Sequence, residues 1–423
     1  MSNTGETAGP AASAAVEQSP TKCQEPSIRA KIRLTNELRR KFKFNGTEYR
    51  FRTTQYSIQG DRKYQEDQLL VYDDEEFMAF GVFDGHGGKE AAVYARDNLI
   101  ENIQRQPGFL SESPSLMMEA ITDGYLATQE AISEVADSWP KTGSGHRSTS
   151  GTTASIVIVD LRNAKLYTGH VGDSRIIIGS TLENRDLWDS TSLTKDHKPD
   201  NVDEFQRIMS HGGSVVVKLN VSRVVWKRSN QHGSVDKVPF LSIARSLGDL
   251  WSYNEETAEY VVSPQPDVDC YDLCGQFRCL ILGSDGLFNM VPNLETVRVM
   301  QEVMEFNDKH KEADIRRNAA SELVILALNK WRSRKLRSDN ISVLTIAIET
   351  SDASDQTEES DEEENSTPRL PLNHLNQNRA CAGMKRSRSL DSVCPKPAKV
   401  HIMDLRGAKD RACKRSSSTT TKN

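Results

Sequence analysis

The sequence predicts an α+β fold in which sheets and helices are stacked in layers. Between residues 51 and 349, short apolar runs of strand length alternate with amphipathic stretches of helix length. Helical stretches lie between strand-like runs that end in an aspartate, a spacing that suits a four-layer α/β/β/α sandwich. The composition changes abruptly on both sides of this region, so one large folded domain with two tails is expected.

Each element is predicted from its own local pattern. The strand-like runs are 78–83, 155–159, 165–171, 175–178, 280–282 and 341–348, and the third and fourth are expected to form a hairpin. Amphipathic periodicity predicts helices over 89–104, 116–136, 202–211, 294–304 and 315–333. Residues 29–50 are basic and weakly patterned, which predicts either a first strand or a surface arm.

The composition favours a soluble, intracellular chain. The 423 residues carry a net charge of −6 and have a mean hydropathy of −0.59, which is low for a wholly packed globule. We find no apolar run of transmembrane length and no signal-peptide pattern at the start, so no membrane association is expected. The cysteines are scattered without the spacing of a metal site, which predicts reduced thiols.

The chain is expected to have three parts. Residues 1–28, rich in Ser, Ala, Thr, Glu and Pro, are predicted to be disordered. Residues 29–350 form the folded domain. Residues 351–423 are predicted to be a disordered tail, acidic over 351–366 and then basic and rich in Ser and Thr.

Carboxylates gather at the ends of the strand-like runs. Four runs end in an aspartate beside small residues, and these are Asp84, Asp173, Asp285 and Asp339. The segment 61–67 adds an arginine and the pair Glu66-Asp67. Several carboxylates in one pocket would repel each other strongly, so they call for hard cations. Ligation by oxygen alone suits Mg²⁺ or Mn²⁺ and argues against Zn²⁺.

Seven motifs, in order, resemble those of the metal-dependent protein phosphatases (the PPM, or type 2C, serine/threonine phosphatases). They are Arg62 with Glu66-Asp67 and the segments 84–88, 150–154, 172–175, 244–249, 284–286 and 338–340. The resemblance covers roughly residues 50–350. It implies that the two sheets are antiparallel and flanked by helices, and that residues 29–350 are a phosphatase catalytic domain.

Three further segments are similar to the DNA-damage-induced nuclear (delta) branch of the animal family. They are 139–142, 220–228 and 248–253. This likeness implies a place in nuclear DNA-damage or checkpoint signalling and the cell cycle.

The family resemblance implies a centre of two Mg²⁺ or Mn²⁺ ions. It places Asp84 as the bridge between the ions, with the Gly85 carbonyl as a further ligand. Asp285 and Asp339 would complete the ligands of one ion. Glu66 would hold the second through water, and Asp67 would orient a metal-bound water. Taken singly, each of these acidic residues could equally cap a helix or form a turn.

Two residues match the groups that would handle the phosphate. Arg62 matches the clamp whose planar fork holds phosphate oxygens. His86 matches the general acid that protonates the leaving oxygen, a role suited to imidazole. A surface arginine and a structural histidine are the respective alternatives.

A third, weaker ion is implied at Asp173. Here the chain departs from the family pattern, because Asn289 stands where the usual motif has an aspartate four residues after Asp285. Asparagine offers a carbonyl but no charge, so this third site should be weaker. Asp249 is expected to be either structural or a support for a metal-bound group.

Residues 218–240 occupy the position of the family's substrate-side flap. Arg223, Lys227 and Arg228 make its first half basic, which predicts binding of acidic or doubly phosphorylated substrates. The second half, 229–236, is nearly neutral, unlike the delta-type flap. A solvated loop without a role in binding is the alternative.

The tail contains two short basic clusters, 385–388 and 396–399, with the spacing of a bipartite nuclear import signal. A nuclear location, with cytoplasm as a second one, is therefore predicted; a generic basic tail that binds acidic partners is the alternative. The tail has no aromatic residue for base stacking, so direct nucleic-acid binding is not expected.

The sequence therefore predicts an enzyme, a metal-dependent protein serine/threonine phosphatase. Its expected partners are phosphorylated proteins, checkpoint kinases among them, and the nuclear import machinery, and a monomer is expected. The alternative is a phosphatase-like scaffold that sequesters a nuclear kinase or checkpoint protein without catalysis. Because Asp84, Asp285 and Asp339 are all present, catalysis is favoured.

Overall fold

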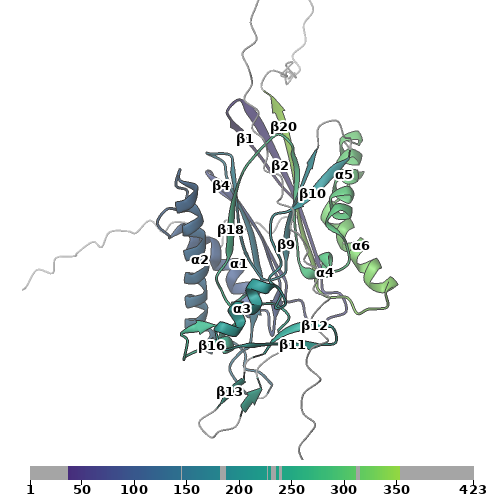
Figure 1. Ribbon diagram of the computed structural model, residues 1–423. Helices are drawn as coiled ribbons and strands as arrows, with labels where there is room; N and C mark the ends of the chain where they lie inside the picture. The colour runs from purple at the N-terminus through teal and green to yellow at the C-terminus, as the bar shows by residue number, and fades with distance from the viewer. Residues whose placement is uncertain are drawn as a thin grey trace, which may run out of the picture. The chain divides into compact units, whose positions relative to one another are not determined.

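The computed structural model describes residues 37–352, except 144, 182–186, 226, 230–234, 238–240 and 311–314 (Figure 1). The first tail, 1–28, and all but the first two residues of the second, 351–423, lie outside this range. Their disorder and the predicted domain boundaries stay predictions.

Two antiparallel sheets form the centre of the fold, as predicted. The first has the order β18 (Asp267–Asp272), β8 (Lys165–Val171), β7 (Ala154–Asp160), β4 (Phe77–Phe83) and β3 (Gln68–Asp73). The second has the order β1 (Glu37–Phe44), β2 (Thr47–Ile58), β20 (Ile341–Asp352), β19 (Phe277–Gly283), β9 (Arg175–Thr181) and β10 (Trp188–Ser192). Strand β4 is buried along its whole length because it is covered on both faces.

Helices cover the outer face of each sheet (Figure 1). Helices α1 (Glu90–Gln104) and α2 (Pro114–Val135) pack on the first sheet, and α5 (Asn293–Lys309) and α6 (Ala319–Ser333) pack on the second. A third apolar cluster, which includes Phe80, Val157 and Leu282, fills the space between the sheets. The four-layer α/β/β/α sandwich is therefore confirmed.

Shorter elements complete the described part of the chain. A small three-stranded sheet joins β5 (Gly85–His86), β6 (Gly151–Thr152) and β15 (Leu247–Gly248). The others are α3 (Val202–Ser210), α4 (Asp285–Phe288), β11 (Ser214–Lys218), β12 (Val221–Val225), β13 (Lys227–Ser229), β14 (Val235–Lys237), β16 (Tyr253–Asn254), β17 (Glu259–Tyr260) and single 3₁₀ turns at Ala136–Ser138 and Leu250–Ser252. Within the described ranges, no helix combines the length and apolarity needed to cross a bilayer.

The predicted hairpin of 165–171 with 175–178 is wrong. Strand β8 pairs with β7 and β18, whereas β9 pairs with β10 and β19 in the other sheet. The link between them, 172–174, starts at Gly172 with φ +104°, a left-handed conformation that turns the chain from one sheet to the other. Asp173, one of the predicted metal ligands, lies within this crossing between the two sheets.

Two other boundaries have local causes. Residues 37–58 form the β1–β2 hairpin, and its two-residue turn Asn45-Gly46 has positive φ at both positions, as a tight hairpin requires. Helix α6 starts at Ala319 rather than at 315, because the Asn318 side chain accepts a hydrogen bond of 3.0 Å from the Ser321 amide and caps it.

Candidate active site

The loops that carry the predicted metal ligands contact each other closely. A Cβ atom added to Gly85 would lie only 2.5 Å from the Glu66 carbonyl oxygen. A Cβ atom added to Gly286 would lie 2.0 Å from the Asn340 carbonyl oxygen. Glycine at these two positions therefore lets the loop before β3 approach that after β4, and lets the start of α4 approach the loop before β20.

The carboxylates on these loops act on each other electrostatically. Desolvation raises the pKa of Asp84 well above its usual range, and the carboxylates of Asp67, Asp285, Asp173 and Asp339 raise it further. Desolvation also raises the pKa of Asp285 to about 8, helped by Asp173 and Asp339 and opposed by Lys198. The structure thus brings the predicted aspartates from five loops into one electrostatic cluster.

Asp67 is the most deeply buried of these acidic residues with a shifted pKa. Burial raises the pKa of its carboxyl to about 6, although the nearby hydroxyls of Ser342 and Ser284, which lie outside hydrogen-bond geometry, work against the shift. Neither carboxylate oxygen has a hydrogen-bond partner among the described residues. A buried, unpartnered carboxylate is costly, and a cation or its bound water would satisfy it. The donor set therefore fits a hard divalent ion.

Two cationic side chains hold carboxylates of this cluster. Arg62 donates to Asp339 over 2.5 Å, and its guanidinium is more than half exposed. Lys198 forms an ion pair with the buried Asp173. In the part of the chain that the structure describes, no group of three or more His, Cys, Asp or Glu side chains is positioned to hold a metal ion. The carboxylates therefore interact electrostatically without forming a preassembled ligand group.

Glu66 is fixed from both directions. Its backbone amide donates to the Asn340 side chain over 2.9 Å, and its Oε1 accepts from the Gly88 amide over 2.8 Å. The first bond holds the Glu66 loop against the segment before β20, and the second holds it against the segment that follows Asp84. Gly85 itself lies in β5, opposite Thr152.

His86 is paired with Asp249, a residue 163 positions away in the sequence. Its Nε2 lies 2.7 Å from Asp249 Oδ2, and Asp249 also accepts from Ser246 Oγ and Trp251 Nε1. Desolvation alone would lower the pKa of His86, but the Asp249 carboxylate outweighs it and the pKa is raised. Asp249 therefore orients His86 and favours its protonated form.

Asn289 interacts directly with a predicted ligand. Its Nδ2 donates to Asp285 Oδ2 over 3.1 Å. At the place where the family pattern has another carboxylate, this chain therefore has a neutral hydrogen-bond donor.

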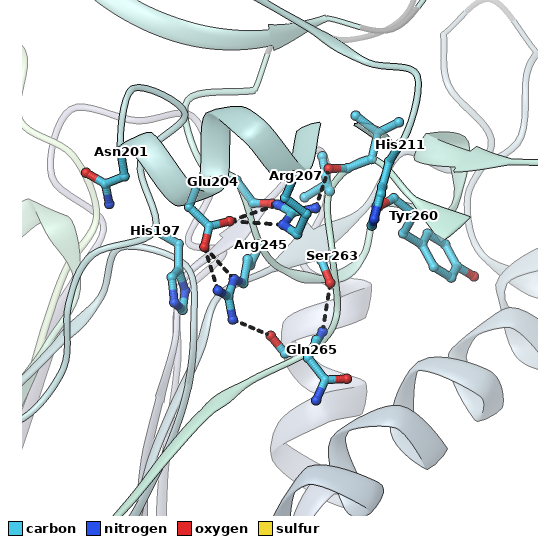
Figure 2. A network of polar contacts seen from close by, with 12 residues as sticks. His197, Asn201, Glu204, Arg207, His211, Arg245, Tyr260, Ser263 and Gln265 are labelled. Atoms are coloured by element: carbon cyan, nitrogen blue, oxygen red, sulfur yellow. Dashed lines mark hydrogen bonds and ion pairs between the residues drawn. The ribbon is translucent and has the colours of Figure 1, made fainter. Parts of the chain in front are cut away.

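A network of charged groups around the buried Glu204 supports the loop that carries Lys198 (Figure 2). Arg207 and Arg245 both donate to Glu204, at 2.9 and 2.5 Å. His197 connects this network to the β8–β9 crossing, because its amide donates to the Gly172 carbonyl over 2.7 Å and its Nε2 lies 3.1 Å from Asp267. Arg245 also donates to Asp267 over 2.8 Å, which closes the network.

The network has complete internal charge compensation. Burial by itself would raise the pKa of Glu204, but the guanidiniums of Arg245 and Arg207 outweigh it and the pKa is lowered. The hydrogen bond from His197 lowers the pKa of Asp267 strongly. The network is therefore a stable platform for the Asp173 loop.

The predicted flap residues lie in two hairpins. Arg223 is half-buried in β12, which pairs with β11. Lys227 and Arg228 lie in β13, which pairs with β14, but their side chains are outside the described part of the chain. Their binding role stays a prediction.

Two contacts at the site were missed by sequence reasoning. The motif containing Asp249 was visible, but nothing in it identified His86 as its partner. Lys198 was not singled out, since a lysine in a loop has no pattern of its own.

Comparisons with known proteins identify the family of this chain. The family model for protein phosphatase 2C matches residues 51–335. "Probable protein phosphatase 2C 52" of Oryza sativa subsp. japonica is 32% identical over 249 residues, which are 58% of this chain and 43% of the relative. "Probable protein phosphatase 2C 69" of Arabidopsis thaliana is 30% identical over 266 residues, 62% of this chain and 64% of the relative. This chain thus spans less than two thirds of either relative.

The fold has solved counterparts. The serine-threonine phosphatase 2C from Toxoplasma gondii has a TM-score of 0.59 and 23% identity, and the match covers 74% of this chain and 98% of that one. The chain belongs to the protein phosphatase 2C family. The plant relatives do not support the narrower resemblance to the animal delta branch.

Proposed function

We propose that this protein is a protein serine/threonine phosphatase that hydrolyses phosphoserine and phosphothreonine at a centre of two Mg²⁺ or Mn²⁺ ions. The observation that carries the proposal is the cluster of mutually repelling carboxylates in which Asp67 has no partner among the described residues. Such a cluster is unfavourable without bound cations.

The proposed ligands follow from the cluster. Asp84, the Gly85 carbonyl, Asp285 and Asp339 would hold the ions directly. Glu66 and Asp67 would hold metal-bound water, and Asp173 would contribute to a weaker third ion. When bound, two such ions supply a hydroxide near neutral pH and neutralise phosphate oxygens. The ion pair of Lys198 with Asp173 and the neutral side chain of Asn289 both argue for weak occupancy of the third metal site.

Two side chains would act on the phosphate ester itself. The exposed guanidinium of Arg62 can exchange Asp339 for phosphate oxygens, to which it would donate two parallel hydrogen bonds. His86 would protonate the leaving serine or threonine oxygen. Because Asp249 holds Nε2, the proton would come from Nδ1, and the raised pKa keeps that proton available near neutral pH.

The proposal is tested by phosphate release from a phosphothreonine peptide with Mg²⁺ or Mn²⁺, with EDTA as a control. Wild type is compared with Asp285→Asn and with Lys309→Ala, a distant exposed site on α5. We expect metal-dependent turnover in wild type and Lys309→Ala and its loss in Asp285→Asn. A wild-type protein as inert as Asp285→Asn on several peptides would leave the alternative of a non-catalytic scaffold that sequesters a kinase or checkpoint protein.

We further propose a nuclear location and a part in DNA-damage or checkpoint signalling, with phosphorylated checkpoint kinases among the substrates. The delta-like segments and the basic clusters at 385–388 and 396–399 support it; the clusters lie outside the described residues. Replacing Lys385, Arg386, Lys396 and Lys399 by alanine should move a tagged protein from nucleus to cytoplasm. Unchanged nuclear accumulation would remove the import signal from the proposal.

A further inference from the structure

A large cavity lies beside the candidate active site. Its volume is 720 Å³, and it starts next to Arg62, since residues 63–66 form one wall. Gly87 and Gly88 continue this wall, and residues 140–143 with 148–149 form another. Glu66 belongs both to the cavity and to the proposed metal ligands. A polypeptide whose phosphoresidue reached the metal centre could therefore extend into this space.

Three lysines from separate segments line the cavity. Lys63 follows the phosphate-clamp arginine, Lys89 precedes α1, and Lys141 lies in the loop after α2. All three are exposed, and none forms an ion pair with a carboxylate within the described ranges. The two carboxylates of the lining are Glu66, which the proposed centre would use, and Glu90. The cavity therefore has an excess of uncompensated positive charge.

We propose that this cavity binds acidic residues, or a second phosphorylated residue, next to the reacting phosphoserine or phosphothreonine. Lys63, Lys89 and Lys141 would contact those negative groups. The inference rests on the proposed phosphatase function and names the substrate class of that same site. Ammonium groups act as mobile point charges rather than as fixed forks, so they select for negative charge more than for one arrangement of it.

The test uses two phosphothreonine peptides of equal length that differ only in three flanking residues, all Glu in one and all Gln in the other. The variant is Lys63→Ala/Lys89→Ala/Lys141→Ala. Wild type should prefer the acidic peptide in kcat/KM by about tenfold, the product of three exposed ion pairs. The variant should show a ratio of about one to two. Because both peptides are measured with the same protein, the ratio cancels differences in folded fraction and metal loading.

The matched control is Arg298→Ala/Lys309→Ala/Arg334→Ala, which removes the same charge from exposed positions on and beside α5 and α6. This control should keep the wild-type preference. A lysine variant that keeps the preference, or a control that loses it equally, would overturn the proposal. Peptide affinity is measured in parallel by fluorescence anisotropy. If wild type has no metal-dependent turnover, the phosphatase function fails, while anisotropy still decides whether the cavity selects the acidic peptide.

Discussion

Glu204 and Asp67 are equally buried, each about 4% exposed, but their surroundings are opposite. Glu204 accepts from two guanidiniums, and its pKa is lowered. Asp67 lies among other carboxylates without a hydrogen-bond partner in the described part of the chain, and its pKa is raised to about 6. The difference distinguishes a carboxylate whose countercharge is part of the fold from one whose countercharge must be bound from solution.

The largest expected effect is on the uncompensated cluster. Asp84→Asn removes the proposed bridge between the two ions, so phosphothreonine hydrolysis should fall at least about a thousandfold, or about 4 kcal/mol in activation free energy. Isothermal titration with Mn²⁺ should show a matching loss of metal binding. Full turnover by Asp84→Asn would contradict the claim that this carboxylate cluster, unlike the Glu204 network, needs bound cations.

The compensated cluster should respond in stability instead. Glu204→Ala leaves Arg207 and Arg245 without their shared carboxylate. Because both guanidiniums are partly exposed, we expect the lower end of the range for a broken buried pair, about 3 kcal/mol of unfolding free energy. Chemical denaturation in EDTA measures it. Asp67→Asn in the same assay should leave the unfolding free energy unchanged or raise it. Equal losses in the two variants would contradict the inferred difference between Glu204 and Asp67.

The pair His86–Asp249 combines features of both clusters. Its carboxylate has a partner within the fold, as Glu204 has, but that partner is a group proposed to act in catalysis. His86→Gln should lower turnover of a phosphothreonine peptide about a hundredfold, the usual contribution of a general acid. Hydrolysis of para-nitrophenyl phosphate, whose leaving group needs no proton, should fall far less. Asp249→Asn removes the charge that raises the pKa of His86, so the alkaline limb of the pH profile should shift to lower pH, and turnover should fall less than in His86→Gln. Equal losses on both substrates would assign His86 a structural role.

The smallest expected effect is the pH dependence of the metal-free protein. Asp67 has a folded pKa of about 6, above the unfolded value of about 3.9. Between these values the folded state binds more protons than the unfolded state, so stability falls as pH rises through the window, by about 2 kcal/mol. The Asp285 pKa of about 8 extends the decline upward. Saturating Mg²⁺ should flatten the curve, and Asp67→Asn should reduce its slope in EDTA; a curve that rises over this window would contradict the prediction.

Much of the fold could be predicted from local pattern. Strand β4 and helix α1 have the apolar runs and periodicity of buried elements, and their observed limits lie within a residue of the prediction. The partner of β9 could not be predicted in the same way. Neighbouring strands usually pair, but here the chain crosses into the other sheet at the turn that begins with Gly172.

The metal-binding character of the candidate site could be predicted, because it follows from the type of residue at the strand ends. Carboxylates at strand ends indicated hard cations before any geometry was known. The Asp249–His86 and Lys198–Asp173 contacts join residues 163 and 25 positions apart, and they depend on how the sheets place distant loops. Long-range pairs of this kind have no local pattern.

Strand β20, the last described strand, lies between β2 and β19 in the middle of its sheet, and Asp339 lies two residues before its start. A chain still growing on the ribosome would therefore have a gap in that sheet, with two strand edges open to association with other chains. Until β20 is inserted, the loops of Arg62 and Asp285 also lack their shared partner. Insertion of β20 should therefore complete the active site and cover both open strand edges in one late folding event.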